Sequence, residues 1–287
     1  MTITSLLDHP DLWRADRLYR AAAYRGTSIP SGFPILDRYL PGGGWPTGAV
    51  SELCLAQPGI GELQLLGSAL AQITKNAGRW VLWLNPPFLP YAPGLTAAGI
   101  DAGRMLLVRT DNNTRADRGA PRQRQTHGRR SRQQESADDP HARALWAAER
   151  AARSGTCAMV LAWLDDTRLG QREVQRLQVA ARQGNTLFCL FRPLTALRQA
   201  SFASLRLRLA AGEQTDGRQR LAVDIVKRHG GWPVQGLHLE LDQQRATRAD
   251  VLAQLAFWRE ERARWLPNPG AAWPLPANTG SSPRITH

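Results

Sequence analysis

Apolar runs alternate with helical stretches along most of the chain. Five short and nearly continuous apolar runs, at 50–56, 79–84, 105–109, 158–164 and 186–191, indicate strands that are covered on both faces. Between them the spacing of apolar residues predicts helices at 62–76, 93–98, 142–154 and 168–183. This alternation is typical of an α/β fold that is built on a mostly parallel sheet and flanked by helices.

The pattern changes in the last third of the chain. Strands are predicted at 205–210, 221–228 and 237–241, and turn-rich segments join them in place of helices. They indicate an antiparallel meander that completes the sheet. A terminal helix is predicted at 247–265, with Val251, Leu255, Trp258 and Trp265 on one apolar stripe.

The ends of the chain and one internal segment differ from this core. A short helix is predicted at 11–25, within an N-terminal arm at 1–28. The core is predicted to span 29–245, and the amphipathic helix with its flanks spans 246–266. The insert 110–140 has almost no large apolar residues, and the tail 267–287 is rich in Pro, Gly, Ser and Asn. We expect both the insert and the tail to be disordered.

Composition narrows the class of protein. The formal net charge of +13 favours binding to polyanions, but Lys75 and Lys227 are the only lysines. Such an arginine bias could also reflect a genome rich in arginine codons, so charge alone leaves DNA contact open. Cys54, Cys157 and Cys189 are far apart in apolar runs, which indicates reduced core thiols rather than a metal site or a disulfide framework.

The sequence shows no pattern of a targeting signal or of a membrane span. The first residues lack the pattern of a signal peptide, and no stretch approaches the roughly 20 apolar residues of a membrane span. We therefore expect a cytoplasmic protein that does not bind membranes.

The stretch 29–66 is the most informative one for function. A predicted strand leads into a glycine-containing turn that opens a helix, which is the context in which a turn can direct its amides at a phosphate. On the pattern G-x-x-x-x-G-K-[ST], this turn reads Ala56-Gln57-Pro58-Gly59-Ile60-Gly61-Glu62-Leu63. The second required glycine is present as Gly61, but Glu62 stands at the lysine position and Leu63 at the hydroxyl position.

These two replacements remove the cation that neutralises phosphates and the hydroxyl that holds magnesium. A carboxylate would also repel the phosphates. We therefore interpret Ala56, Gly59, Gly61, Glu62 and Leu63 as a degenerate phosphate loop that binds no cofactor. Glu62 is interpreted as a first-turn acid that complements the helix dipole.

The predicted strand 158–164 supports the same interpretation. It ends in Trp163 and Leu164, and Asp165 and Asp166 follow only afterwards. The two acids could be a displaced metal pair, but acids in a solvated turn before the next helix are the simpler interpretation. No catalytic or metal-binding residue is therefore predicted.

Several stretches together resemble a known family. They are Leu36-Asp37 with the turn Gly42-Gly43-Gly44, then Pro58-Gly59-Ile60-Gly61-Glu62-Leu63-Gln64-Leu65-Leu66, Arg79-Trp80-Val81-Leu82-Trp83-Leu84 and Val160-Leu161-Ala162-Trp163-Leu164. The plan is similar to the nucleotide-binding core of RecA, and more specifically it resembles the ImuA family and its relative SulA. Both are damage-inducible bacterial proteins that derive from RecA without a working nucleotide site. Segments 178–184, 187–193, 205–209, 221–228 and 238–241 fit the longer ImuA plan, so the resemblance covers roughly 29–241.

The resemblance implies a RecA-like twisted sheet and a non-catalytic accessory role in SOS-induced, error-prone translesion DNA synthesis. The implied partners are ImuB, which is a catalytically impaired polymerase relative, and an error-prone DNA polymerase. Contact with RecA, or self-association through the N-terminal helix, is left open. A SulA-like inhibitor of cell division that binds FtsZ is the alternative, but the chain length and the predicted strands at 221–241 favour ImuA.

Two segments are candidate binding surfaces. The stripe of Val251, Leu255, Trp258 and Trp265 could bind a partner protein, or it could cover the chain's own sheet. The insert could contact DNA, or it could be a solvated linker. Its candidate DNA-binding residues are Arg115, Arg118, Arg122, Arg124, Arg129, Arg130 and Arg132.

Overall fold

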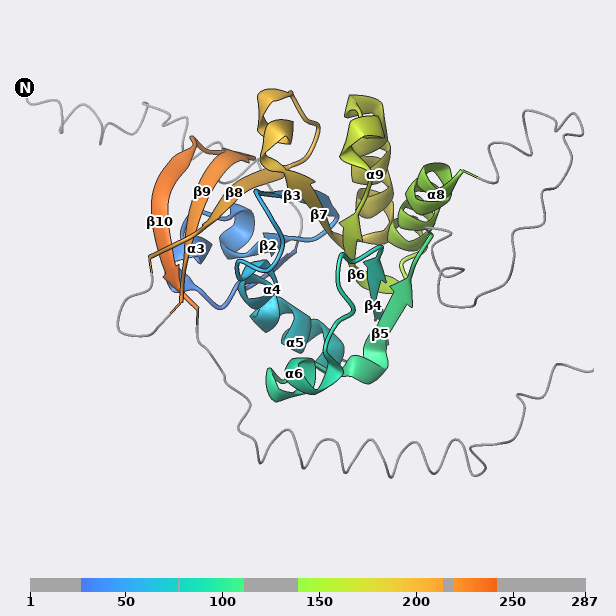
Figure 1. Cartoon of the computed structure of the whole chain (residues 1–287), viewed down its shortest axis with the longest axis horizontal. Helices are drawn as coiled ribbons and strands as arrows, with labels where there is room; N and C mark the ends of the chain where they lie inside the picture. The colour runs from blue at the N-terminus through green and yellow to red at the C-terminus, as the bar shows by residue number, and fades with distance from the viewer. Residues whose placement is uncertain (1–26, 77, 111–138, 214–218, 242–287) are drawn as a thin grey trace, which may run out of the picture. The chain divides into compact units, whose positions relative to one another are not determined.

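A computed structural model describes residues 27–76, 78–110, 139–213 and 219–241. Within these residues, eight strands form one sheet in the order β10-β9-β8-β3-β7-β6-β4-β5 (Figure 1). Six strands that are neighbours in the sheet, in the order β8-β3-β7-β6-β4-β5, run parallel to one another. They are β3 (Ala49–Leu55), β4 (Trp80–Leu84), β5 (Met105–Val108), β6 (Cys157–Trp163), β7 (Leu187–Pro193) and β8 (Leu205–Ala211).

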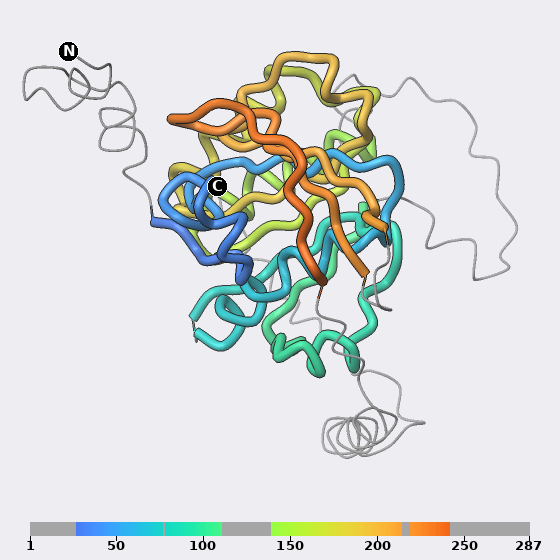
Figure 2. Tube along the Cα trace, turned by 90° about the vertical axis from the view of Figure 1, so that its left-hand side faces the viewer, coloured from blue at the N-terminus to red at the C-terminus, as the bar shows by residue number. Residues whose placement is uncertain are grey.

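The last strands run antiparallel to one another. β8 pairs with β9 (Arg220–Arg228), and β9 pairs with β10 (Val234–Glu240). Figure 2 shows these strands side by side in yellow and orange. A separate antiparallel pair joins β1 (Ser28–Ile29) to β2 (Trp45–Pro46). The predicted α/β fold, with a mostly parallel sheet and a C-terminal antiparallel meander, is therefore confirmed.

Helices cover both faces of the sheet. One face packs against α3 (Pro34–Asp37), α4 (Glu62–Leu65) and α5 (Gly67–Lys75), and α6 (Ala92–Ala97) adds Leu95 at its margin. The other face packs against α8 (Pro140–Arg153) and α9 (Gln171–Gly184). Figure 1 shows the two groups of helices on opposite sides.

The central strand shows why its sequence is so apolar. All seven residues of β3 are buried, with Leu53 and Leu55 on the α5 side and Val50 on the α9 side. Side chains alternate between the two faces of a strand, so both faces of a covered strand must be apolar. Ser51 and Glu52 are the polar exceptions in this strand, and the surroundings of Glu52 are described below.

Two predicted helices differ from the observed ones. The predicted helix 62–76 is two helices, because the N–H of Leu66 bonds to Leu63 across a tight three-residue step. The predicted helix 168–183 begins instead at Gln171, since Asp165 caps a short 3-10 helix at Asp166–Arg168. The other predicted strands and helices agree with the observed ones to within a few residues.

Several predicted segments lie outside the described residues. Nearly all of the N-terminal arm 1–28 and nearly all of the insert 110–140 are among them. The terminal helix 246–266 and the tail 267–287 lie wholly outside. In the part of the chain that the structure describes, no helix is long and apolar enough to cross a membrane.

Candidate functional site at the carboxyl end of the parallel strands

The glycine-containing turn connects the end of β3 to α4, as the sequence predicts. Gly59 and Gly61 have φ values of 92° and 111°, which only glycine adopts easily. The side chain of Glu62, which is 4% exposed, folds back over this turn. Its Oε1 accepts the N–H of Gly59 at 2.8 Å, and its Oε2 accepts the N–H of Gly61 at 3.2 Å.

This geometry gives Glu62 a more specific role than a helix-dipole acid. Amides that converge in a glycine-rich turn form a cradle for an anion. Here the anion comes from the chain itself, because the carboxylate bonds to the two amides. Leu63, at the position of the magnesium-binding hydroxyl, packs against the core on the α5 side.

The meander covers the other side of the turn. Gln219 donates from Nε2 to the carbonyl of Ile60 at 3.1 Å. A Cβ added to Gly61 would lie 2.2 Å from Cδ1 of Leu241, which is itself buried. The turn is therefore held by the carboxylate of Glu62 on one side. On the other side it contacts Gln219, which precedes β9, and Leu241, which follows β10.

The end of β6 is aromatic rather than acidic. The ring of Trp163 stacks on Phe191 of β7 with centroids 4.1 Å apart and planes at 2°, and Trp83 of β4 lies 6.0 Å from it on the other side. All three rings pack with the core on the α5 side, where the turn and its helix also lie. An apolar stack, and not an acid, therefore stands at the end of β6.

Asp165 and Asp166 are both engaged by protein groups. Asp165 accepts the N–H of Thr167 at 3.1 Å and its hydroxyl at 2.7 Å, and the hydroxyl bond is the main reason why the pKa of Asp165 is lowered. Asp166 accepts from Nε of Arg192 at 2.5 Å. The interpretation as turn acids therefore fits Asp165, whereas Asp166 belongs to a buried ionic network. In the described residues, no group of three or more His, Cys, Asp or Glu side chains could hold a metal ion.

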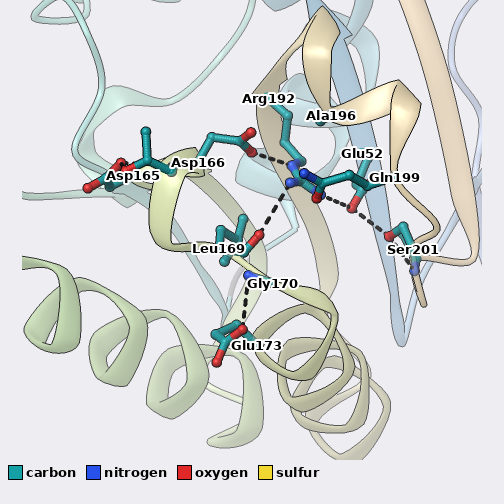
Figure 3. Close-up of polar contacts among 12 residues, drawn as sticks. Glu52, Asp165, Asp166, Leu169, Gly170, Glu173, Arg192, Ala196, Gln199 and Ser201 are labelled. Atoms are coloured by element: carbon teal, nitrogen blue, oxygen red, sulfur yellow. Dashed lines mark hydrogen bonds and ion pairs between the residues drawn. The ribbon is translucent and has the colours of Figure 1, made fainter.

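The ionic network centres on Glu52, which is 0% exposed (Figure 3). Its Oε1 accepts from Nη1 of Arg192 at 2.9 Å and from Oγ of Ser201 at 2.6 Å. Its Oε2 accepts from Nε of Arg206 at 2.6 Å. Both of its oxygens are therefore bound, and the carboxylate bridges the two strands that flank β3.

The two arginines use their remaining donors on backbone carbonyls. Arg206 donates to Gln199 and Ala196, both at 2.8 Å, and Arg192 donates to Leu169 at 3.5 Å. Burial lowers the pKa of Arg192, but the bond to Asp166 and the charge of Glu52 outweigh it, so the pKa is raised overall. Burial, reinforced by the nearby charge of Glu52, raises the pKa of Cys54 to about 12. Arg192 therefore stays charged, and the neighbouring thiol of Cys54 stays neutral.

Sequence reasoning missed this network. The run of β3 reads as apolar, and its pattern assigns no role to the single carboxylate, Glu52. A signal was present, because Glu52 is a charge inside a continuous buried run, and Arg192 and Arg206 are charges in two further runs of the same kind. The other predicted site residues, Val251, Leu255, Trp258 and Trp265 together with Arg115, Arg118, Arg122, Arg124, Arg129, Arg130 and Arg132, lie outside the described residues.

Comparison with known proteins identifies no family for this chain. No protein-family model matches the chain, and no curated protein matches it significantly. Among solved structures, the chain is similar to SulA from Pseudomonas aeruginosa, with 21% identity and a TM-score of 0.34. That match covers 50% of this chain and 97% of the SulA chain. The α/β assignment accordingly rests on the strand order and register described above.

Proposed function

We propose that this chain is a non-catalytic accessory protein of an SOS-induced, error-prone translesion synthesis complex. In that complex it acts as an adaptor with an ImuB-like protein and an error-prone DNA polymerase. The observation that carries the non-catalytic part is the carboxylate of Glu62, which bonds to the amides of Gly59 and Gly61. A triphosphate would have to displace this carboxylate and would then meet its negative charge at close range.

The magnesium side of the site supports the same proposal. The side chain of Leu63 packs against the core and has no oxygen, and the ring of Trp163 lies at the end of β6. Asp165 is bonded to Thr167 and Asp166 to Arg192. Because a fold that has lost its reaction centre can still present surfaces, binding to partners is the function that remains available.

The translesion part of the proposal rests on the sequence resemblance over roughly 29–241. The fold supports this part through β9 and β10, which complete the sheet. These strands belong to the part of the ImuA plan that extends past a SulA-like chain. A role as an inhibitor of cell division would use the same core, so the two functions must be separated by experiment.

Nucleotide binding tests the non-catalytic part. Titration of the purified chain with ATP and magnesium in a calorimeter is expected to give no binding heat. Tight, magnesium-dependent uptake of nucleotide would overturn the proposal.

Genetics tests the translesion part. Deletion of this gene is expected to lower damage-induced mutation to the level of an ImuB deletion, and the double deletion is expected to lower it no further. Overproduction is expected to leave cell length unchanged. Filamentous cells, together with normal mutation in the deletion strain, would favour the FtsZ-binding alternative.

A further inference from the structure

The loop between β4 and α6 places three large apolar side chains in solvent. Phe88, Leu89 and Tyr91 are 70%, 68% and 60% exposed. No residue from 85 to 100 is charged, although 21% of the residues in the chain are. Exposed apolar side chains that gather in one place mark surfaces for partner proteins, whereas single scattered ones do not. We call Phe88, Leu89 and Tyr91 the loop anchors.

The loop is fixed at both of its ends. Asn85, with φ 52°, donates to the hydroxyl of Thr110 at 2.9 Å and accepts the N–H of Thr110 at 2.8 Å. At the other end Ile100 is buried in the core, and its N–H bonds to the carbonyl of Leu95 at 3.0 Å. The residues between include Pro86, Pro87, Pro90 and Pro93, which fix φ. A loop restrained in this way loses little conformational entropy when it binds, which favours affinity.

The apolar character continues around the loop. No residue of α6 is fully buried. Leu107 of the edge strand β5 is 47% exposed, and it pairs in register with Trp83, on the side of the sheet where Leu95 packs. Figure 1 shows α6 and β5 at the end of the sheet opposite to β10. The loop anchors therefore lie at the margin of the sheet where α6 and β5 also leave apolar surface in solvent.

Charge indicates the kind of partner. The stretch 85–100 offers no cation to a nucleic acid, so it lacks the phosphate contacts on which such binding depends. Basic groups stand at its C-terminal end, since Nζ of Lys75 lies 3.7 Å from the position of a Cβ on Gly99, and Arg104 stands over the ring of Trp80. A second copy would bring the same charge of +13 and would be repelled. The complementary surface is an apolar groove with an acidic rim on a different protein.

We propose that Phe88, Leu89 and Tyr91 anchor this chain in such a groove of its partner protein. Aromatic side chains that enter a partner's pocket commonly carry most of the binding energy of an interface. The inference rests on the function proposed above, within which the partner is the ImuB-like protein.

The test measures the affinity of the full-length chain for a purified ImuB-like protein from the same organism. Phe88→Asp is expected to weaken binding by about 10-fold or more, because it puts a charge into the apolar groove. The control is Trp232→Asp in the turn between β9 and β10, where Trp232 is 86% exposed at the opposite edge of the sheet. The control is expected to bind like the wild type. Equal urea midpoints for both variants and the wild type would show that folding is unchanged.

The outcomes distinguish a failure of the inference about the loop anchors from a failure of the proposed function. If the wild type binds and Phe88→Asp binds equally well, the loop anchors are not the interface, although the proposed function stands. If the wild type does not bind the ImuB-like protein, the proposed function fails and the inference fails with it. The inference is also overturned if Phe88→Asp instead abolishes binding to phosphatidylcholine vesicles, or abolishes a dimer seen by light scattering, because the occupant would then be a membrane or a second copy.

Discussion

Glu52 and Glu62 are both buried carboxylates on the same strand-and-turn segment, but the protein holds them in opposite ways. Glu52 is bound by two guanidinium groups that lie 140 and 154 residues away in sequence. Glu62 is bound by neutral amides at most 3 residues away. The first arrangement depends on the whole sheet, whereas the second can close as soon as the turn forms.

The difference also determines what each carboxylate leaves behind when it is removed. Loss of Glu52 leaves Arg206 buried without the carboxylate that pairs with it, and leaves Arg192 with Asp166 alone. Loss of Glu62 leaves two N–H groups, and that of Gly59 belongs to an exposed residue that water can reach. Uncompensated buried charge costs more than unpaired amides near water, so the two sites should differ clearly in their effect on stability.

The largest effect is expected for Glu52→Gln. This variant keeps the shape of the side chain but removes its charge, and it should lower the free energy of unfolding by about 3–5 kcal/mol. Urea unfolding followed by circular dichroism measures the change.

A matched control for Glu52→Gln is Glu149→Gln. Glu149 also binds two arginines, Arg153 and Arg176, but the side chains of both are about half exposed. We expect this variant to lose at most about 1 kcal/mol. Equal losses in the two variants would show that burial of the arginines around Glu52 does not set the cost.

A smaller effect is expected for Glu62→Ala. It should lower the free energy of unfolding by about 1–3 kcal/mol, because two amides of the turn lose a charged acceptor. The control is Glu173→Ala, since Glu173 accepts one exposed amide, that of Gly170, at 2.9 Å. The control should lose less than Glu62→Ala in the same urea experiment. A neutral Glu62→Ala would mean that the carboxylate does not hold the turn.

The same contrast explains what the sequence could predict. Strand runs, the glycine-containing turn and the loss of its lysine and hydroxyl are local patterns, and the turn is found where the pattern places it. The network around Glu52 joins β3, β7 and β8. Its ion pairs can be predicted only from the strand order, which the sequence pattern does not give. Even for Glu62 the pattern gives the residue but not its bonds, because a helix-dipole acid and an acid that folds back over its turn have the same sequence.

A third carboxylate extends the comparison to the surface. Asp139 accepts from Nη1 and Nη2 of Arg168 at 2.8 and 2.6 Å, and it also caps α8 through the N–H of His141. The bond to Arg168 is the main reason why the pKa of Asp139 is lowered from 3.8 to about 2. A lowered carboxyl pKa contributes stability that is complete above the ordinary value and is lost as the pH falls through the lowered one.

Arg168→Gln should therefore raise the pKa of Asp139 back towards 3.8, which an NMR titration of its carboxyl carbon would detect. Added salt should raise the pKa in the wild type but much less in the variant, because the ion pair is exposed to screening. Of the three carboxylates, this one should matter least to stability at neutral pH, since water solvates both partners when the pair is broken. A pKa that stays low in Arg168→Gln would assign the shift to the cap of α8 instead. The N-terminus of α8, rather than the arginine, would then stabilise the charge of Asp139.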